Sequence, residues 1–236
     1  MQLFYDKNLS KNDTTFTFDK TESRHIVRVL RKREGDLLHI TNGKGFLFNV
    51  KIVVANEKKC LVELVKLEKK EQPFSYYLHI AIAPTKNNQR LEWFLEKATE
   101  IGISEITPII CENSERKIVK NERMEKVLIS AMKQSNRFHL PILNEATTFK
   151  NFINKKIEGN LFIAHCEETK KESLKKTLIE VKKLTLLIGP EGDFSTNEID
   201  FALKNNYKAV TLGNSRLRTE TAGIVAVHSV AFINEF

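Results

Sequence analysis

From residue 73 onward, strand-like and helix-like segments alternate along the chain. Short aliphatic and β-branched runs predict strands, whereas apolar residues that recur every three or four positions predict helices. We expect strands at 77–83, 106–110, 161–165, 184–188 and 209–212, and helices at 91–101, 121–136, 172–183 and 196–205. This alternation favours an α/β domain built on a mostly parallel sheet.

A polar stretch that ends in Pro73 separates this region from a first part of different character. Three segments of the first part have strand character: 37–41, 46–54 and 60–67. We therefore predict two domains, residues 1–72 and 73–236. The first is expected to be a small β-barrel with one short helix near residues 22–32.

The last segment, residues 221–236, is apolar around nearly the whole circumference of a predicted helix. Such a helix must be buried on every side. Two arrangements satisfy this requirement. The helix is either sunk into its own domain or placed at a subunit interface, most often a two-fold one.

Charge and composition narrow the class of protein. The net charge is +8, and residues 1–72 carry 15 basic against 10 acidic side chains, so most of the excess lies there. A polyanionic partner is therefore favoured. No apolar run is long enough to span a membrane and no secretory signal is evident. Three widely spaced cysteines argue against disulfides or a metal site, so we expect a reduced, cytoplasmic protein.

The segment 188–195 is a strand end that runs through a Gly/Pro loop into a helix. Ligands sit at the carboxyl ends of strands in open α/β sheets, and Ser195 with Glu198 fits a capping box at the helix start. Glu191 and Asp193 would repel a phosphate, so a cationic or neutral ligand suits the loop better. An ordinary strand–turn–helix junction is the alternative.

The segment 212–223 repeats this design, again with a strand, a glycine-containing loop and a helix. Arg216 and Arg218 stand beside the expected ligand crevice, and burying them requires a partner such as Glu220 or a bound anion. A surface turn is the alternative. If both loops bind one ligand, the bends near positions 190 and 215 must meet at a shared cavity.

Arginines are also concentrated near the amino terminus. If residues 22–32 are helical, Arg24, Arg28 and Arg31 form one basic stripe that can follow a phosphate backbone. A solvated helix face explains the same pattern. The polar run that ends at Arg137 is compatible with either a helix end or a nucleic-acid contact.

Five segments, in this order, carry a family resemblance: His25-x-x-Arg28-Val29-Leu30-Arg31; Arg90-x-Glu92-Trp93 with Lys97–Gly102; Gln134-Ser135-x-Arg137; Ile188–Ser195; and Leu212-Gly213-x-x-x-Leu217–Ala222. Over nearly the whole chain the sequence resembles the RsmE family of 16S ribosomal RNA uridine-N3 methyltransferases. The last two motifs are quite specific for that family, although Asp193 stands where it usually has glycine.

The resemblance implies a PUA-like β-barrel followed by a SPOUT α/β domain with a C-terminal trefoil knot. It implies a homodimer that acts on 16S rRNA in the small ribosomal subunit, with no membrane and no metal. The cofactor would be S-adenosylmethionine (SAM), bound by Ile188, Gly189, Pro190, Glu191, Gly192, Leu212, Gly213, Leu217, Thr219 and Thr221. RNA contacts would come from Arg24, Arg28, Arg31, Lys32 and Arg137.

For catalysis, Arg218 is expected to stabilise the anion that forms when uracil N3 loses its proton, and Glu220 to orient Arg218 or accept that proton. Two alternatives remain open. In the first, the protein is a SPOUT methyltransferase that acts on another RNA or on a ribose 2′-hydroxyl. In the second, it is a non-catalytic RNA-binding assembly factor.

Overall fold

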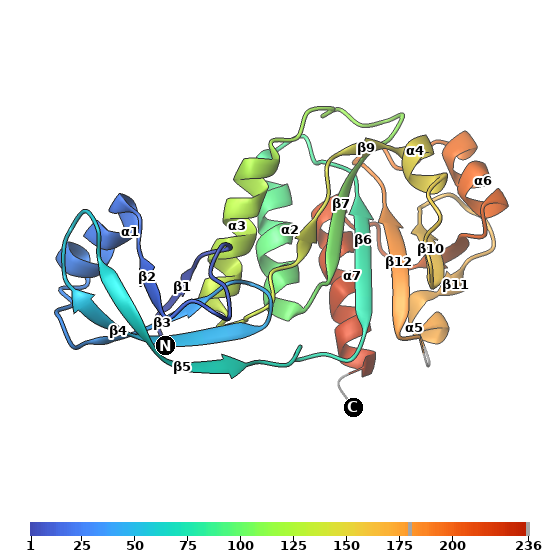
Figure 1. The fold of residues 1–236 in the computed structure, drawn as a ribbon. Helices are drawn as coiled ribbons and strands as arrows, with labels where there is room; N and C mark the ends of the chain where they lie inside the picture. The colour runs from blue at the N-terminus through green and yellow to red at the C-terminus, as the bar shows by residue number, and fades with distance from the viewer. Residues whose placement is uncertain (179–180, 235–236) are drawn as a thin grey trace. The chain divides into compact units, whose positions relative to one another are not determined.

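The computed structural model describes residues 1–178 and 181–234 (Figure 1). The chain divides into two compact units, Met1–Gln72 with Met132–Leu140, and Pro73–Ala131 with Pro141–Phe236. The sequence-based division gave residues 132–140 to the second domain. They pack with the first unit because Gly45 N donates to Phe138 O at 2.9 Å and Leu140 N donates to Gly43 O at 2.9 Å.

The first unit is a curled five-stranded sheet in the order β1-β3-β4-β5-β2. Its strands are β1 (Leu3–Tyr5), β2 (Thr15–Thr17), β3 (Leu37–Thr41), β4 (Phe46–Val54) and β5 (Leu61–Lys69). Register shifts between β4 and β5 bend the sheet around a core that includes Phe4, Ile40 and Phe48. Among the described residues, β1 and β2 are the two edge strands and do not pair with each other. The strand pairing therefore does not close the sheet into the predicted barrel.

The helix predicted at residues 22–32 ends earlier in the structure and passes from an α-helix into a π-helix. Helix α1 (Lys20–Arg24) begins at Asp19, whose side chain accepts from Glu22 N at 2.8 Å, and a π-helical turn follows at His25–Val29. Arg31 lies beyond the turn with φ of 54°. The predicted stripe is therefore wrong at Arg31, because the wider π turn and the left-handed backbone end the helical spacing.

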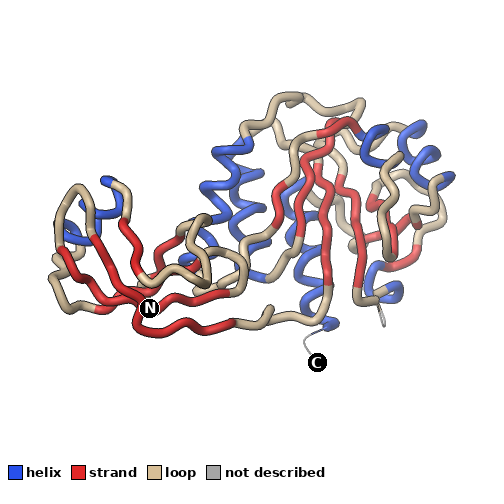
Figure 2. Tube along the Cα trace, viewed as in Figure 1, coloured by secondary structure: helices blue, strands red, loops and turns tan. Residues whose placement is uncertain are grey.

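The second unit is built on a parallel sheet in the order β11-β13-β10-β12-β6-β7-β8, with β9 also paired to β7. The strands are drawn in red in Figure 2. The strands are β6 (Tyr77–Ile82), β7 (Glu105–Ile110), β8 (Ile142–Leu143), β9 (Thr147–Thr148), β10 (Asn160–Ala164), β11 (Glu172–Ser173), β12 (Lys183–Ile188) and β13 (Lys208–Thr211). The predicted α/β class and parallel sheet are confirmed.

Helices accompany this sheet: α2 (Asn88–Ile101), α3 (Asn121–Gln134), α4 (Phe149–Ile153), α5 (Leu174–Thr177), α6 (Thr196–Lys204) and α7 (Thr219–Asn234). The helix predicted at 172–183 is wrong at both ends, because Glu172–Ser173 is β11 and Lys183 begins β12, and residues 179–180 lie outside the described part. Along α7, a Cβ at Gly223 would lie 2.6 Å from the Phe94 ring, so glycine permits the close approach of α2.

Helix α7 is buried on one side only. Ala226, Val227 and Val230 are buried against the unit, whereas Phe232 is 57% exposed. Burial inside its own domain, one of the two expected arrangements, is therefore wrong, and residues 235–236 of that segment lie outside the described part. No helix in residues 1–178 and 181–234 combines the length and apolar character needed to cross a membrane.

A buried polar cluster lies at the amino ends of β6 and β7. Tyr77 donates from its hydroxyl to Glu105 Oε2 at 2.6 Å, and the His79 Nε2 atom lies 2.8 Å from Thr107 Oγ1. Asn144 Nδ2 donates to Glu105 Oε1 at 2.6 Å. Burial lowers the pKa of His79 to about 4.

This pKa predicts a loss of stability on acidification. The unfolded chain protonates His79 near its ordinary pKa of 6.5, so it binds more protons than the folded protein down to about pH 4. Between pH 7 and 4.5 the wild type should lose on the order of 2 kcal/mol more free energy of unfolding than His79→Gln.

The measurement is urea unfolding at both pH values, followed by the fluorescence of Trp93, the only tryptophan and a residue of the same unit. The control is His228→Gln, because His228 is exposed on α7 of that unit. Equal losses in the wild type and His79→Gln would refute the assignment.

Candidate functional site

Two loops at the carboxyl ends of β12 and β13 define the candidate site. Strand β10 pairs with both strands and therefore holds their ends on the same edge of the sheet. The loops are residues 189–195 and 212–218. The Thr219 hydroxyl donates to the Gly189 carbonyl at 3.0 Å, and both residues are buried. The two bends thus meet directly.

The first loop is closely packed against the Phe194 side chain. A Cβ at Gly189 would lie 3.1 Å from the Phe194 ring, so glycine is needed there for the close approach of Phe194. The predicted capping box at the start of α6 is confirmed, since Ser195 Oγ accepts from Glu198 N and Glu198 Oε2 accepts from Ser195 N. Together these contacts fix where the loop ends.

Asp193 adopts the backbone conformation that glycine favours, with φ of 64°. Its carboxylate accepts from Cys166 N at 2.6 Å and from Phe194 N at 2.9 Å. Aspartate tolerates the left-handed region better than most residues when its side chain bonds nearby backbone. The loop is thereby tied to the segment that follows β10.

A cavity of about 310 Å³ lies between the two loops. Its lining includes most of the residues expected to bind a cofactor, and it also includes Arg218. The predicted residues that line it are Ile188, Gly189, Pro190, Glu191, Leu217, Arg218 and Thr219. Gly192 is not among them, because it faces Asn113, whose Nδ2 donates to Gly192 O at 3.3 Å.

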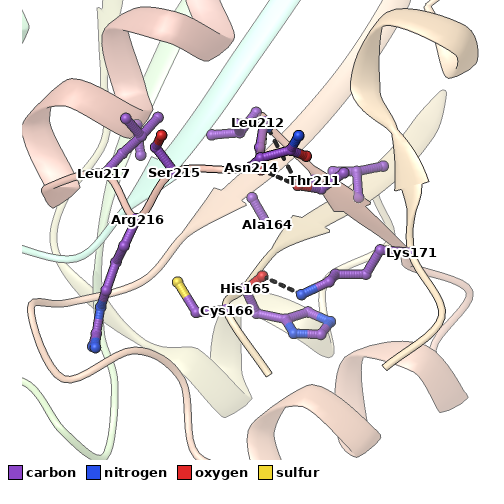
Figure 3. A pocket seen from close by; sticks show the side chains of 13 residues that line it. Ala164, His165, Cys166, Lys171, Thr211, Leu212, Asn214, Ser215, Arg216 and Leu217 are labelled. Carbon is purple, nitrogen blue, oxygen red and sulfur yellow. Dashed lines mark hydrogen bonds between the residues drawn. The ribbon is translucent and has the colours of Figure 1, made fainter. Parts of the chain in front are cut away.

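A second cavity, of about 390 Å³, contains Leu212 and Gly213 (Figure 3). It shares Ala164, Cys166 and Leu217 with the first, so the two form neighbouring parts of one depression. Sequence reasoning missed the residues at the end of β10 and after it: Ala164, His165, Cys166 and Lys171. The signal that could have found them was their place at the carboxyl end of a predicted strand between the other two.

His165 is the most deeply buried polar residue in this second cavity. Its exposed fraction is 6%, and both ring nitrogens lack a hydrogen-bond partner within the part of the chain that is described. Burial lowers the pKa of the His165 ring, which favours the neutral form. Lys171 Nζ donates to the His165 carbonyl at 3.0 Å and closes one side (Figure 3).

Two glutamates present buried oxygens at the site. Glu191 Oε1 accepts from Lys86 N at 3.0 Å, whereas its Oε2 is buried without a partner among the described residues. Glu220 is 6% exposed, and its Oε1 lies 3.7 Å from Arg90 Nε while its Oε2 is likewise unpartnered. We expected Glu220 to pair with Arg218. In the structure Glu220 lies beside Arg90 instead, and the Arg218 side chain is exposed.

A third cavity, of about 680 Å³, is lined by the remaining predicted site residues, Glu220 and Thr221 of α7, together with Arg216–Arg218. Arg216, Leu217 and Arg218 line the first cavity as well. The three-residue segment therefore separates two spaces. No group of three or more side chains able to hold a metal ion occurs among the described residues.

The residues expected to bind RNA all belong to the first unit: Arg24, Arg28, Arg31, Lys32 and Arg137. Arg28 Nε lies 2.6 Å from Glu57 Oε2, and this contact lowers the pKa of Glu57. Arg24 is exposed and Lys32 is half-buried. Part of the basic charge is therefore already balanced within the unit.

Family comparison now adds to this geometry. The model of the RNA methyltransferase domain matches residues 70–231, and that of the RNA methyltransferase PUA domain matches residues 18–65. The chain belongs to the RNA methyltransferase family. A ribosomal RNA small subunit methyltransferase E from Rickettsia conorii is 28% identical over 98% of this chain and 95% of its own length. The resemblance to the RsmE family is thereby confirmed.

Solved structures agree with this membership. A probable rRNA-methyltransferase from Porphyromonas gingivalis has a TM-score of 0.92 and 38% identity, covering 100% of this chain and 99% of that one. A Legionella pneumophila protein described as a methyltransferase, solved with its cofactor SAM, has a TM-score of 0.86 and 26% identity, covering 97% and 96%. The family fold therefore extends over both units.

The contact between the loops yields a stability prediction. Thr219→Val keeps the side-chain shape but leaves the buried Gly189 carbonyl without its donor, and we expect a loss of about 1 to 2 kcal/mol in the free energy of unfolding. Urea unfolding followed by Trp93 fluorescence measures it.

Thr99→Val is the matched control. Thr99 is a buried threonine of α2 whose hydroxyl donates to Leu95 O at 2.7 Å, a carbonyl that the helix also satisfies. This variant should lose less than about 0.5 kcal/mol. A loss for Thr99→Val as large as that for Thr219→Val would contradict the role of the contact.

Proposed function

We propose that this protein is a SAM-dependent methyltransferase that modifies N3 of a uridine in the 16S rRNA of the small ribosomal subunit. The observation that carries the proposal is the Thr219–Gly189 hydrogen bond, which joins two loops around one cavity in a chain of the RNA methyltransferase family. The relative from Rickettsia conorii is named for the small ribosomal subunit, which supports the same substrate.

The cavity residues fit SAM. The buried Glu191 Oε2, which has no partner in residues 1–178 and 181–234, is an acceptor that needs a donor or a positive charge, and SAM carries both on its sulfonium and amino groups. Glu191 and Asp193 also make the cavity unsuited to a phosphate group. Ile188–Glu191, Leu217 and Thr219 would hold the cofactor, with Leu212 and Gly213 in the neighbouring cavity. When bound, SAM supplies an electrophilic methyl group.

The target atom sets the chemistry that the side chains must provide. Uracil N3 carries a proton, and its lone pair becomes available for the new N–CH3 bond only when that proton leaves. The resulting negative charge spreads onto O2 and O4. Because N3 lies in the Watson–Crick edge, the nucleotide must be unpaired when it enters the site.

Glu220 and Arg218 take the two roles. The buried Glu220 Oε2 has no partner among the described residues and accepts the N3 proton, while Arg90 Nε lies 3.7 Å from Oε1. The exposed Arg218 guanidinium reaches the charge that develops on the base oxygens.

The first unit, residues 1–72 with 132–140, supplies RNA binding in this proposal as a PUA-like domain that uses Arg24, Arg28, Arg31, Lys32 and Arg137. Support comes from the PUA-domain match and from the basic surplus of this part of the chain. The second unit, residues 73–131 with 141–236, forms the methyltransferase domain. The protein works in the cytoplasm, where small subunits are assembled.

Two finer features belong to the proposal. The chain forms a homodimer through the half-exposed face of α7, because Phe232 and its apolar neighbours need a cover. The C-terminal segment is threaded as the trefoil knot of SPOUT proteins. Support for the knot is the placement of β10 between β12 and β13, with α7 returning to pack on α2.

The central experiment incubates protein and labelled SAM with small subunits from a strain that lacks this methylation, and maps the product by mass spectrometry. We expect one N3-methyluridine in 16S rRNA. Arg218→Ala should lower kcat by about a hundred-fold or more with little change in cofactor affinity, since it acts on charge that develops during transfer.

Lys204→Ala, an exposed residue of α6, is the control and should keep full activity. Equal losses of kcat and cofactor affinity in Arg218→Ala would place Arg218 in cofactor binding instead. A 2′-O-methyl product or a different RNA target would contradict the proposed substrate. Binding of the subunit without any methyl transfer would contradict the enzymatic activity and favour a non-catalytic assembly factor.

RNA binding by the first unit has its own test. Replacing Arg24 and Arg31 by alanine should weaken binding and flatten its salt dependence, by about 0.7 to 0.9 in log–log slope for each phosphate group that the protein no longer neutralises. Arg28→Ala should change the slope less, because Glu57 already balances its charge. Lys51→Ala, at an exposed position on β4, is the control. An unchanged slope in the double variant would show that Arg24 and Arg31 do not contact RNA.

A further inference from the structure

The only tryptophan of the chain, Trp93, is held on the outer side of a well-anchored helix. Leu91, Phe94 and Leu95 of α2 are buried, whereas Trp93 is 44% exposed. The helix start is fixed by Asn87, whose side chain accepts from Gln89 N at 2.9 Å. The indole is therefore presented by a rigid element rather than by a mobile loop.

Trp93 lines the third cavity, the one of about 680 Å³ that also contains Arg90 and Glu220. Arg216, Leu217 and Arg218 form the boundary between this cavity and the one proposed for SAM. A group bound beside Trp93 is thus separated from the proposed cofactor only by this segment. No other aromatic residue lines the third cavity among the described residues.

We propose that this cavity is the nucleotide subsite and that Trp93 is the platform on which the unpaired uracil stacks. The inference rests on the proposed function and adds the binding face of the substrate base. Aromatic side chains bind unpaired bases by stacking, and tryptophan offers the largest ring for it.

The other side chains match the edge of uracil, which offers two acceptor oxygens and one N–H donor. Arg90 and Arg218 are donors, and the unpartnered Glu220 Oε2 is an acceptor within the described part of the chain. Stacking on Trp93 holds the plane of the base, and these groups then read its edge. Trp93 therefore acts on substrate binding, while Glu220 and Arg218 act on the proton and the charge.

The first test is methylation of small subunits from the unmethylated strain. Trp93→Ala should raise KM or lower kcat/KM by roughly ten-fold or more, while the dissociation constant for S-adenosylhomocysteine stays unchanged. Trp93→Phe should keep most of the activity, because phenylalanine also stacks. Leu203→Ala, an apolar residue 43% exposed on α6, is the control and should resemble the wild type.

The second test uses the wild-type protein and needs no catalysis. With S-adenosylhomocysteine present, a short RNA with one central uridine should quench Trp93 fluorescence more strongly than the same RNA with an abasic site there. Equal quenching by the two RNAs would overturn the stacking role, as would wild-type kinetics in Trp93→Ala.

The two tests separate the inference from the proposed function. If the wild type methylates subunits but Trp93→Ala is equally active, only the platform fails. If the wild type does not methylate subunits, the proposed function fails, and uridine-dependent quenching then decides whether Trp93 binds a base. Trp93 fluorescence that changes with protein concentration and not with RNA would assign this face to a second copy of the chain.

Discussion

The placement of β10 between β12 and β13 is the constraint on which the site depends. Parallel pairing brings the carboxyl ends of the three strands to one edge, and the chain that leaves each end must turn there. The Thr219–Gly189 hydrogen bond and the Asp193–Cys166 contact then connect the three turns. A cavity lined by segments far apart in the sequence follows from this single topological fact.

The charged side chains at that edge are distributed over the two cavities. Glu191 and Asp193 line only the cavity proposed for SAM, Arg90 and Glu220 line only the cavity proposed for the nucleotide, and Arg216 and Arg218 line both. The cationic donor therefore meets an acidic pair, and three arginines border the cavity proposed for the nucleotide. The segment 216–218 belongs to both sides and is the place where transfer would occur.

Local sequence signals predicted much of this arrangement. Strand and helix periods located the parallel sheet, and the capping box at Ser195 located the start of α6. Contacts between distant segments were out of reach, because no local pattern shows that β10 lies between β12 and β13 or that Arg90 faces Glu220. The π turn after Arg24 was missed for a different reason. Its residues follow an ordinary helical period, so the local pattern does not distinguish it from an α-helix.

The chain passes between its two units three times, after residues 72, 131 and 140. The segment around His139 pairs with Lys44 and supplies backbone partners that the first 72 residues lack on their own. An exchange of the amino-terminal unit between related proteins therefore needs three coordinated crossovers in the gene, one at each passage. Recombination at a single breakpoint would separate the sheet from a piece of its own backbone, so the two units are expected to be inherited together.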